Sequence, residues 1–309
     1  MSEAKTHLVT GGGGFVGGHL VGALLASGAR VRDIDLKPGR ISHPNLDHWS
    51  GSFLDASLIR EGLVGIDTIY HLAATNFPRE SNREPLRDAQ ENLIGSLQLL
   101  DIAAKSGVRR FVFISSGGTV YGPTETVPIR EDHPTNPITA YGICKLAFEK
   151  YLRLYAAQEP IETIALRLAN PYGANQDIRK AQGALTTFAH RAVNGEPIEI
   201  WGDGSVERDF IHIDDVVTGI LAAGRAAASG LEVNLGSSEG VSLKRLISEI
   251  ELALGRSIDV TYKPARQFDV PRNYLDISLA KSVLGWVPEV GLRDGISRLL
   301  ADMSAAAGD

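Results

Sequence analysis

The sequence predicts an α/β fold built on a doubly wound parallel sheet. Short apolar runs alternate with longer segments whose apolar residues recur at helical spacing, and a glycine-rich turn follows the first run. The runs are Leu8–Thr10, Val31–Leu36, Leu46–Gly51, Thr68–His71, Arg110–Ser115 and Thr163–Leu168. Strand and helix in repetition imply parallel strands joined by right-handed crossovers. We therefore expect these runs to lie together in one sheet.

From about Asn170 the alternation gives way to loops, short strands and isolated helices. The pattern predicts a larger domain over residues 1–169 and a smaller lobe over residues 170–309. In the lobe we expect a strand at Ile198–Trp201 and helices at Leu243–Leu254 and Leu292–Met303. The apolar pieces Phe210–Val217 and Val233–Gly236 are typical of core segments that return to the main sheet. The two parts are therefore expected to be interleaved through residues 210–236.

Composition excludes several classes of function. The 309 residues carry 31 Lys and Arg against 37 Asp and Glu, a net charge of −6, so nothing favours a nucleic-acid-binding surface. The single cysteine, Cys144, allows no internal disulfide and no thiol zinc site. No apolar stretch approaches the roughly 20 residues that cross a bilayer, and no signal peptide is visible. We expect a cytoplasmic protein without membrane or nucleic-acid partners.

The eight histidines offer no metal-binding cluster. His212-Ile213-Asp214-Asp215 resembles a ligand group at first sight, but it follows a strand and opens a helix. Capping of that helix by the acids is the expected role. We predict no metal site.

The first apolar run leads into a turn with glycines at regular spacing. Gly11, Gly14 and Gly17 lie between a strand and an amphipathic helix, with Phe15 and Val16 opening that helix. Glycine permits a tight turn and lets backbone N–H groups approach a pyrophosphate, and the helix N-terminus favours an anion. The arrangement predicts a Rossmann-like dinucleotide site.

An acid at the end of the next run supports that interpretation. Asp35 is placed to accept hydrogen bonds from an adenosine ribose and to repel a 2′-phosphate, which favours NAD over NADP. Asp33 is the competing acid, although it lies inside the run. Nearby Arg32, Lys37 and Arg40 keep NADP as an alternative.

A second constellation follows the fifth run. Tyr141 and Lys145 are four residues apart, so on a helix both side chains point into one cleft. A lysine ammonium and an oxidised nicotinamide would both lower the tyrosine pKa from ~10 and make it usable as a base. Ser115, Ser116 and Thr119 end the preceding strand, where such sheets place ligand groups. They are candidates for orienting a substrate hydroxyl.

In these motifs the chain resembles the extended short-chain dehydrogenases/reductases, specifically the NAD-dependent nucleotide-sugar epimerase/dehydratase family and within it the UDP-glucose 4-epimerases. The resemblance covers nearly the whole chain. Further matching stretches are His71-Leu72-Ala73-Ala74, Asn92, Asn170-Pro171-Tyr172-Gly173, Trp201-Gly202-Asp203-Gly204, Arg208-Asp209-Phe210 and Arg266-x-x-Asp269.

The resemblance implies roles for these residues. It places Leu72, Ala73 and Ala74 under the cofactor and adds Ser52, Phe53, Asn92 and Ser115 to the cofactor site. It also implies that seven residues bind the nucleotide-sugar substrate, with Trp201 beside the base. They are Ser116, Asn170, Trp201, Arg208, Arg266, Asp269 and Asn273. Guanidinium groups suit a diphosphate, which agrees with the two arginines.

Several positions depart from the family pattern. Gly117 stands where 4-epimerases usually carry a third hydroxyl residue, so Ser116 or Thr119, or an ordered water, must substitute. Gly118 and Thr119 stand where 4,6-dehydratases carry an Asp-Glu pair, which argues against elimination of water.

Two further departures concern the ligand contacts. Ser52 replaces a usual Asp near the adenine, where Phe53 is expected to pack on the purine face. Asn273 replaces a bulky tyrosine, and the smaller side chain would admit 2-acetamido sugars.

We therefore expect an NAD-dependent 4-epimerase of a nucleotide hexose or N-acetylhexosamine, with UDP the expected nucleotide. Tyr141 is the expected base, Lys145 its partner, and Ser116 and Thr119 the groups that orient the sugar. A 4-ketoreductase or dehydrogenase, a 4,6-dehydratase and a cofactor-sensing binding protein remain alternatives. Helices around Leu93–Ala104 and Leu146–Ala156 are expected to pair across a two-fold axis in a homodimer.

Overall fold

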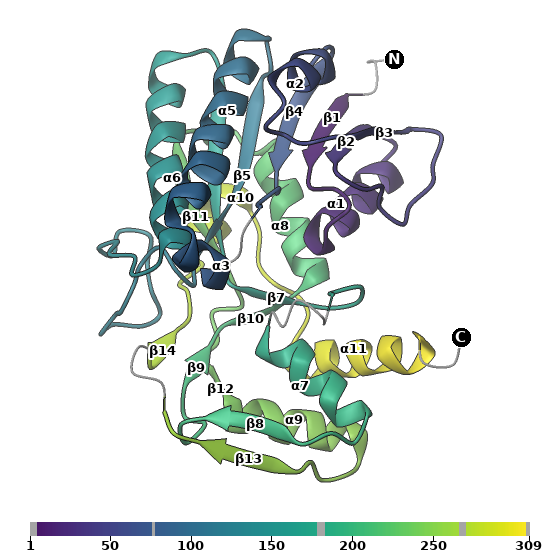
Figure 1. Cartoon of the computed structure of the whole chain (residues 1–309), viewed down its shortest axis with the longest axis vertical. Coiled ribbons are helices and arrows are strands. Elements are labelled where there is room, and N and C mark those ends of the chain that lie inside the picture. Colours follow the sequence, from purple (N-terminus) through teal and green to yellow (C-terminus); the bar gives the residue numbers. More distant parts are fainter. Residues whose placement is uncertain (1–4, 76–77, 178–182, 266–269, 307–309) are drawn as a thin grey trace.

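A computed structural model describes residues 5–75, 78–177, 183–265 and 270–306, and it contains the expected parallel sheet (Figure 1). The strands are β1 (Thr6–Thr10), β2 (Arg30–Asp35), β3 (Leu46–Ser50), β4 (Ile66–His71), β5 (Arg110–Ser116), β6 (Glu162–Leu168) and β11 (Leu231–Leu235). They follow the order β11-β6-β5-β4-β1-β2-β3, and every neighbouring pair is parallel. All six strands predicted from the sequence are confirmed in this sheet.

Helices cover both faces of the sheet. One face packs against α1 (Phe15–Ala26), α8 (Ile213–Arg225) and α10 (Ser278–Leu284), and the other against α2 (Ala56–Gly62), α5 (Gly95–Lys105) and α6 (Ala140–Gln158). Before α5 the chain forms α3 (Pro78–Arg83), α4 (Pro85–Asp88) and the π-helical turn η1 (Ala89–Ile94). Each face has its own apolar core, so the sheet is buried between two helical layers as expected for a doubly wound fold.

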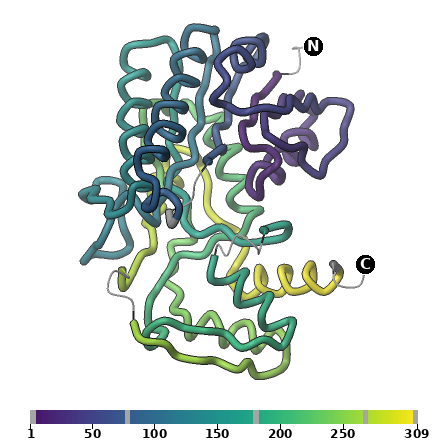
Figure 2. Tube along the Cα trace, in the orientation of Figure 1, coloured from purple at the N-terminus to yellow at the C-terminus, as the bar shows by residue number. Residues whose placement is uncertain are grey.

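The smaller lobe lies below the sheet domain in Figure 2 and has a third apolar core of its own. Its helices are α7 (Ala184–Val193), α9 (Leu243–Leu254) and α11 (Leu292–Ala306). Its strands are β8 (Ile198–Trp201) paired with β13 (Val260–Lys263), and β9 (Glu207–Arg208) between β12 (Val241–Ser242) and β14 (Arg272–Asn273). The predicted strand at Ile198–Trp201 and helix at Leu243–Leu254 are confirmed, and the last predicted helix extends to Ala306.

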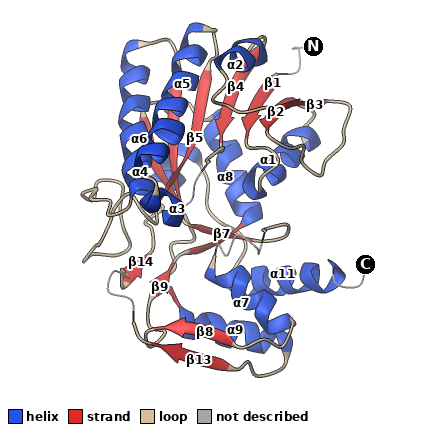
Figure 3. Ribbon diagram, in the orientation of Figure 1, coloured by secondary structure: helices blue, strands red, loops and turns tan. Residues whose placement is uncertain are grey.

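The chain returns from the lobe to the main sheet by a route that differs in part from the prediction. β11 pairs with β6, as expected for Val233–Gly236. β10 (Phe210–His212) does not join that sheet, because it pairs with β7 (Asn170–Tyr172) between the two parts (Figure 3). The following residues form α8, which is capped by the side chain of His212 itself and not by the acids after it.

Asn273 in β14 bonds to Gly117 just beyond β5, so the lobe meets the carboxyl end of the sheet, the edge at which doubly wound folds bind ligands. Within the described residues, no helix is both long and apolar enough to cross a membrane.

Candidate active site

The glycine turn after β1 is packed too tightly for any side chain. Gly11 has a φ of 83°, in the left-handed region, and a Cβ there would lie 2.8 Å from the backbone nitrogen of Ala73. A Cβ on Gly17 would lie 2.0 Å from the carbonyl oxygen of Gly11. Glycine at these positions lets α1 and the loop after β4 close on the turn.

The N-terminus of α1 fits a phosphate group. Gly14 is its N-cap and makes no side-chain capping bond, and the first turn carries no acidic residue. Among the described residues, no side chain caps the first backbone N–H groups of this helix, and the helix dipole favours an anion there.

The two candidate acids of β2 have different surroundings. Asp33 is buried, accepts a hydrogen bond from the Gly12 nitrogen at 3.0 Å and lies 2.9 Å from Nδ1 of His48. Asp35 is half-buried at the strand end and accepts from the backbone nitrogen of Gly13 at 3.1 Å. Only Asp35 therefore combines a place at the end of the strand with access to a ligand.

The two arginines near Asp35 are engaged elsewhere. Arg32 donates to Asp47 at 3.2 Å and to the Gly62 carbonyl at 2.8 Å, and it stacks on Trp49. Arg40 bonds to Asn175. These contacts argue against an arginine that holds the 2′-phosphate of NADP.

The loop after β4 forms one wall of the site. Leu72 donates to the Thr10 carbonyl at 3.1 Å, which places Ala73 against the glycine turn, with Ala74 next in the loop. Asn92 in η1 holds the end of this loop, because its Oδ1 accepts from the Thr75 nitrogen at 2.9 Å.

The two residues expected near the adenine make internal contacts. Oγ of Ser52 accepts from the Leu54 nitrogen at 3.2 Å. Phe53 is only 7% exposed and packs edge-on against His71, with ring centroids 5.1 Å apart. Its ring lies in the core and offers no open face to a purine, which corrects the expectation for this side chain.

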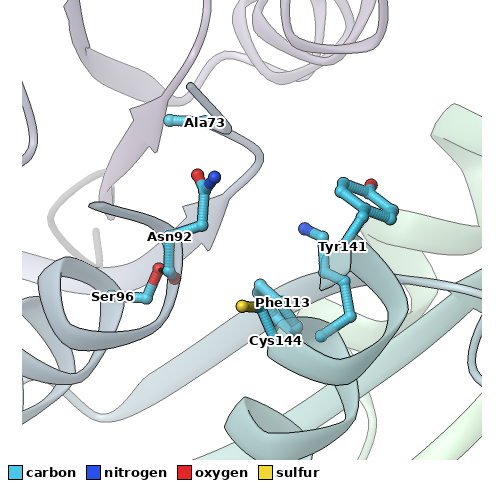
Figure 4. A pocket seen from close by; sticks show the side chains of 7 residues that line it. Ala73, Asn92, Ser96, Phe113, Tyr141 and Cys144 are labelled. Carbon is cyan, nitrogen blue, oxygen red and sulfur yellow. Dashed lines mark hydrogen bonds between the residues drawn. The ribbon is translucent and has the colours of Figure 1, made fainter. Parts of the chain in front are cut away.

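Tyr141 and Lys145 meet in a pocket between α6 and η1 (Figure 4). The other lining residues are Ala73, Asn92, Ser96, Phe113 and Cys144. Lys145 Nζ lies 5.4 Å from the centroid of the Tyr141 ring and donates to the Ile114 carbonyl at 2.8 Å.

The start of α6 fixes the tyrosine against the end of β5. Thr139 caps the helix by accepting from the Gly142 nitrogen at 3.1 Å, and a Cβ on Gly142 would lie 2.8 Å from the Thr119 carbonyl. This close approach brings Tyr141 beside the loop that carries the candidate hydroxyl groups.

Without a ligand, the pKa of Tyr141 is not lowered as the sequence predicts, whereas that of Lys145 is lowered. Burial raises the pKa of Tyr141 to about 12, and the negative charge of Asp88 adds to the rise. Burial lowers the pKa of Lys145 to about 8, against the charges of Asp88 and Glu149. Burial thus outweighs any effect of Lys145 on the tyrosine pKa in this state, and the positive charge of a bound oxidised cofactor would favour the phenolate.

The candidate hydroxyl groups separate into two kinds. Ser115 is buried and donates to Glu149 at 2.5 Å, so its side chain belongs to the interior and not to the cleft, which corrects the prediction. Ser116 is half-buried at the end of β5. Oγ1 of Thr119 is buried and has no hydrogen-bond partner within the described part of the chain.

The structure gives a steric reason for a glycine, without a hydroxyl group, at position 117. A Cβ at this glycine would lie 2.6 Å from Cδ1 of Leu275, so the leucine occupies the space that a larger residue would need. Asn273 is 3% exposed, and its Nδ2 donates to the Gly117 carbonyl at 3.3 Å. The loop and the smaller lobe are thus fitted to a glycine here.

Of the predicted substrate residues, Asn170 in β7 and Arg208 in β9 lie near this junction. Nδ2 of Asn170 donates to the Asp209 carbonyl at 2.8 Å, and Arg208 donates to the Val270 carbonyl at 2.8 Å. Trp201 is 41% exposed and lines a second pocket between α7 and β8. Arg266 and Asp269 lie outside the described residues.

Two sets of residues near the pocket were not predicted from the sequence. Asp88 is fully buried beside it, and Glu149 forms a buried ion pair with Arg167 at 2.8 Å behind Ser115. The periodic pattern would place Glu149 one turn after Lys145, but nothing in it distinguishes a buried acid from a solvated one. Across the described ranges, no group of three potential ligand side chains is placed to hold a metal.

Comparison with known proteins identifies the family. Residues 7–236 match the family described as NAD dependent epimerase/dehydratase. The chain belongs to that family. It is 36% identical to UDP-glucose 4-epimerase of Mycolicibacterium smegmatis, over 94% of this chain and 96% of the relative.

Two further proteins are similar over nearly the whole chain. The dTDP-4-dehydro-6-deoxyglucose reductase of Escherichia coli is 33% identical, over 95% of this chain and 96% of that protein. A solved structure of UDP-glucose 4-epimerase with UDP-glucose, from Thermotoga maritima, superposes with a TM-score of 0.93 at 35% identity, covering 98% of this chain and 99% of that one. The family and fold inferred from the sequence are thereby confirmed.

Proposed function

We propose that this protein is an NAD-dependent UDP-hexose 4-epimerase that keeps its cofactor bound. The observation that carries the proposal is the joint position of Tyr141 and Lys145 in a pocket walled by the same loop that packs on the glycine turn. Relatives named UDP-glucose 4-epimerase match almost the whole chain and support the same activity.

The residues for the cofactor follow from the geometry. Gly11, Gly14 and Gly17 with the start of α1 take the pyrophosphate, and Asp35 takes the adenosine ribose. Leu72, Ala73, Ala74 and Asn92 form the wall, and Tyr141 and Lys145 lie at the nicotinamide end. When bound, NAD supplies a hydride acceptor that becomes the hydride donor in the second half of the reaction.

The chemistry assigned to the chain is proton transfer and positioning. The Tyr141 phenolate takes the proton of the sugar 4-hydroxyl as C4 is oxidised, and it returns that proton to O4 when the turned 4-keto sugar is reduced at the opposite face of C4. Lys145 stabilises the phenolate and binds the cofactor ribose. Ser116 and Thr119 hold the sugar O4, and Oγ1 of Thr119 has no hydrogen-bond partner among the described residues that would compete.

The smaller lobe is assigned to the nucleotide. Trp201, with Phe188 and Arg191 from α7, lines a pocket suited to a base and a phosphate. Asn170, Arg208, Arg266, Asp269 and Asn273 are assigned to the diphosphate and sugar.

The second candidate function is a 4-ketoreductase of a nucleotide sugar. The Escherichia coli reductase, almost as similar in sequence, favours it. The same Tyr141 and Lys145 would serve, but the cofactor would leave after each turnover. Gly118 and Thr119 provide no carboxyl group at the places where dehydratases carry their acids, so dehydration has less support.

The experiment is a proton NMR time course of the purified protein on UDP-glucose and on UDP-N-acetylglucosamine, without added cofactor. New anomeric signals of the galacto isomer establish epimerisation with a resident cofactor, and the faster substrate identifies the sugar that the Asn273 side chain admits. Absence of both signals, with turnover of a 4-keto sugar when NADH or NADPH is added, would establish the reductase instead.

A homodimer completes the proposal. Large apolar side chains are exposed on α4, η1 and α6, which lie on the outer side of the sheet domain: Leu86, Ile94, Ile143, Tyr151 and Leu154. A second copy placed across a two-fold axis would cover them with its own equivalents. Light scattering should give twice the chain mass for the native protein and a monomer for Leu154→Glu, and a native monomer would contradict the assembly. The cytoplasmic location expected from the sequence stays a prediction.

A further inference from the structure

A chain of buried polar side chains runs from the end of β1 to the cofactor pocket. Oγ1 of Thr10 lies 2.7 Å from Nδ1 of His71, and Nε2 of His71 lies 2.9 Å from Oγ of Ser96. Ser96 donates to the backbone carbonyl of Asn92 at 2.5 Å, and the side-chain Nδ2 of the same residue donates to Asp88 at 2.7 Å. The chain therefore links the strand below the glycine turn to a buried acid.

The direction of every bond in this chain is determined. Ser96 has one proton and gives it to the Asn92 carbonyl, so it must accept from Nε2–H of His71. Nδ1 of His71 then accepts from Thr10. Burial and the nearby Lys145 lower the pKa of His71 to about 3, which keeps the ring neutral as this pattern requires. Each donor points towards Asp88.

Asp88 is the last acceptor in this series of hydrogen bonds. Its Oδ1 accepts from Asn92 and, at 2.9 Å, from the Ser81 hydroxyl of α3. Its Oδ2 is buried and has no hydrogen-bond partner within the described residues. The side chain is 0% exposed, and no ion pair among the described residues involves it. A buried carboxylate in this state needs a positive charge nearby.

Lys145 supplies the positive charge near Asp88. Its ammonium group is buried, and the carboxylates whose charges act on it are those of Asp88 and Glu149. Glu149 already has Arg167 at 2.8 Å, whereas Asp88 has no such partner. The other titratable groups that face Lys145 are Tyr141 and Cys144 of α6 and His71 of β4, and none of them carries a positive charge at neutral pH.

We propose that Asp88 is a positioning residue of this active site: it orients Asn92, which holds the loop after β4, and its charge balances the ammonium of Lys145. The inference rests on the proposed function, because it assigns Asp88 to the epimerase site. Asn92 connects the two effects, since it donates to Asp88 and accepts from the Thr75 nitrogen.

Two substitutions separate charge from hydrogen bonding. Asp88→Asn keeps an acceptor oxygen for Asn92 and Ser81 and removes the charge. Because that charge raises the pKa of both Tyr141 and Lys145, both limbs of the kcat–pH profile should move to lower pH by about one unit. Asp88→Ala also removes the acceptor, so the purified variant should lose most of its resident NAD while Asp88→Asn retains it.

Cys144 provides a readout that needs no turnover, because it is the only cysteine in the chain. Burial raises the pKa of its thiol to about 12, and Asp88 adds to the rise. In Asp88→Asn the thiolate fraction at a fixed alkaline pH should increase about tenfold, and alkylation by iodoacetamide should accelerate in proportion. The matched control is Asp302→Asn, the same change on the exposed side of α11.

The outcomes are distinct. Faster alkylation and a shifted profile in Asp88→Asn, with NAD lost only from Asp88→Ala, support the proposal. Alkylation and a pH profile equal to those of Asp302→Asn would overturn it. If the native protein does not epimerise UDP-hexoses, the proposed function fails, while the alkylation rates and NAD contents still report on Asp88.

A second variant covers failure of Asp88→Asn to fold. Lys145→Met leaves Asp88 buried without a counter-charge, and an ionised buried carboxylate without a partner is costly. Relative to the native protein, this variant should lose unfolding free energy as the pH rises from about 5 to about 8. An unchanged difference across that range would show that Lys145 is not the counter-charge of Asp88.

Discussion

The two ends of the same parallel sheet hold their charges in opposite ways. At the amino end, Arg109 bonds to Asp67 at 3.1 Å and to Glu162 at 2.6 Å. Arg110, which is fully buried, bonds to Glu162 at 2.7 Å and also donates to the carbonyls of Ala223, Ala226 and Ala228 at the end of α8. Every charge in this cluster therefore has a partner.

At the carboxyl end Glu149 and Arg167 form a buried pair at 2.8 Å, but other buried polar atoms of the described residues lack a partner. Oδ2 of Asp88 and Oγ1 of Thr119 are buried without a partner in the described chain. Lys145 and Tyr141 are held in the less favourable environment for their charged forms, since burial lowers the pKa of the first and raises that of the second. The comparison teaches that one end of the sheet stabilises the fold, whereas the other keeps polar groups ready for ligands.

The largest expected effect comes from removing the base at the carboxyl end. Tyr141→Phe should lower kcat about 10³-fold, because general acid–base catalysis is worth 10² to 10⁴. It should leave the free energy of unfolding unchanged or slightly raised, since the Tyr141 hydroxyl makes no hydrogen bond to any residue that the structure describes. NMR assays of quenched reactions measure kcat, and urea unfolding measures the free energy of unfolding. A variant with near-native kcat would remove Tyr141 from the mechanism.

The amino end should respond in the reverse manner. Arg110→Met leaves three backbone carbonyls without their donor and should cost about 3 kcal/mol of unfolding free energy, at about 1 kcal/mol for each lost bond. Activity per folded molecule should be unchanged. Arg130→Met is the matched control, because Arg130 is 64% exposed and its partner Asp132 is 75% exposed. Equal losses in the two variants would contradict the special role of the buried arginine.

The space beside Gly117 gives a smaller effect at the active end. Gly117→Ser places a side chain against Leu275 and should cost about 2 kcal/mol by overpacking. Combining it with Leu275→Ala should return part of that loss through relief of the contact, which is measured as a coupling free energy in a double-mutant cycle. If the unfolding free energies of the two substitutions were strictly additive, contact with Leu275 would not be the reason for a glycine at position 117.

The smallest expected effect is the pH dependence contributed by Asp67. Burial alone would raise the pKa of this acid, but hydrogen bonds from Arg109 and Thr68 hold it well below its usual range. Its contribution to stability is therefore present above the unfolded pKa of ~3.9 and is lost as the pH falls below it. Asp67→Asn should flatten the acid limb by less than about 1 kcal/mol, because the group is partly exposed. A steeper acid limb in the variant would contradict this sign.

The fold was readable because its signals are local. Each strand of the main sheet is a short apolar run next to a helical repeat, and the glycines before Phe15 determine how α1 begins. The prediction that β10 returns to the main sheet was wrong. An apolar run indicates that a segment is buried, but it does not indicate which strand the segment pairs with. Phe53 and Ser115 were misplaced for the same reason, because facing the core or the cleft depends on the tertiary structure.

The site was partly readable for a different reason. Tyr141 and Lys145 lie four residues apart on one helix, so their common face follows from helical geometry alone. Asp88 and Leu275 approach the pocket from segments distant in the sequence, and no spacing rule connects them with α6. Their contributions emerge only when the chain of hydrogen bonds and the space beside Gly117 are seen in the folded protein.

The most direct test of the central claim follows the hydrogen at C4. UDP-glucose deuterated at C4 is incubated with the purified protein and no added cofactor, and the product is analysed by NMR and mass spectrometry. We predict UDP-galactose that retains the deuterium at C4, with no NADH released into solution, because the same resident cofactor removes and returns it. Product that has exchanged its C4 deuterium for solvent hydrogen, or NADH released in step with consumed sugar, would contradict the account.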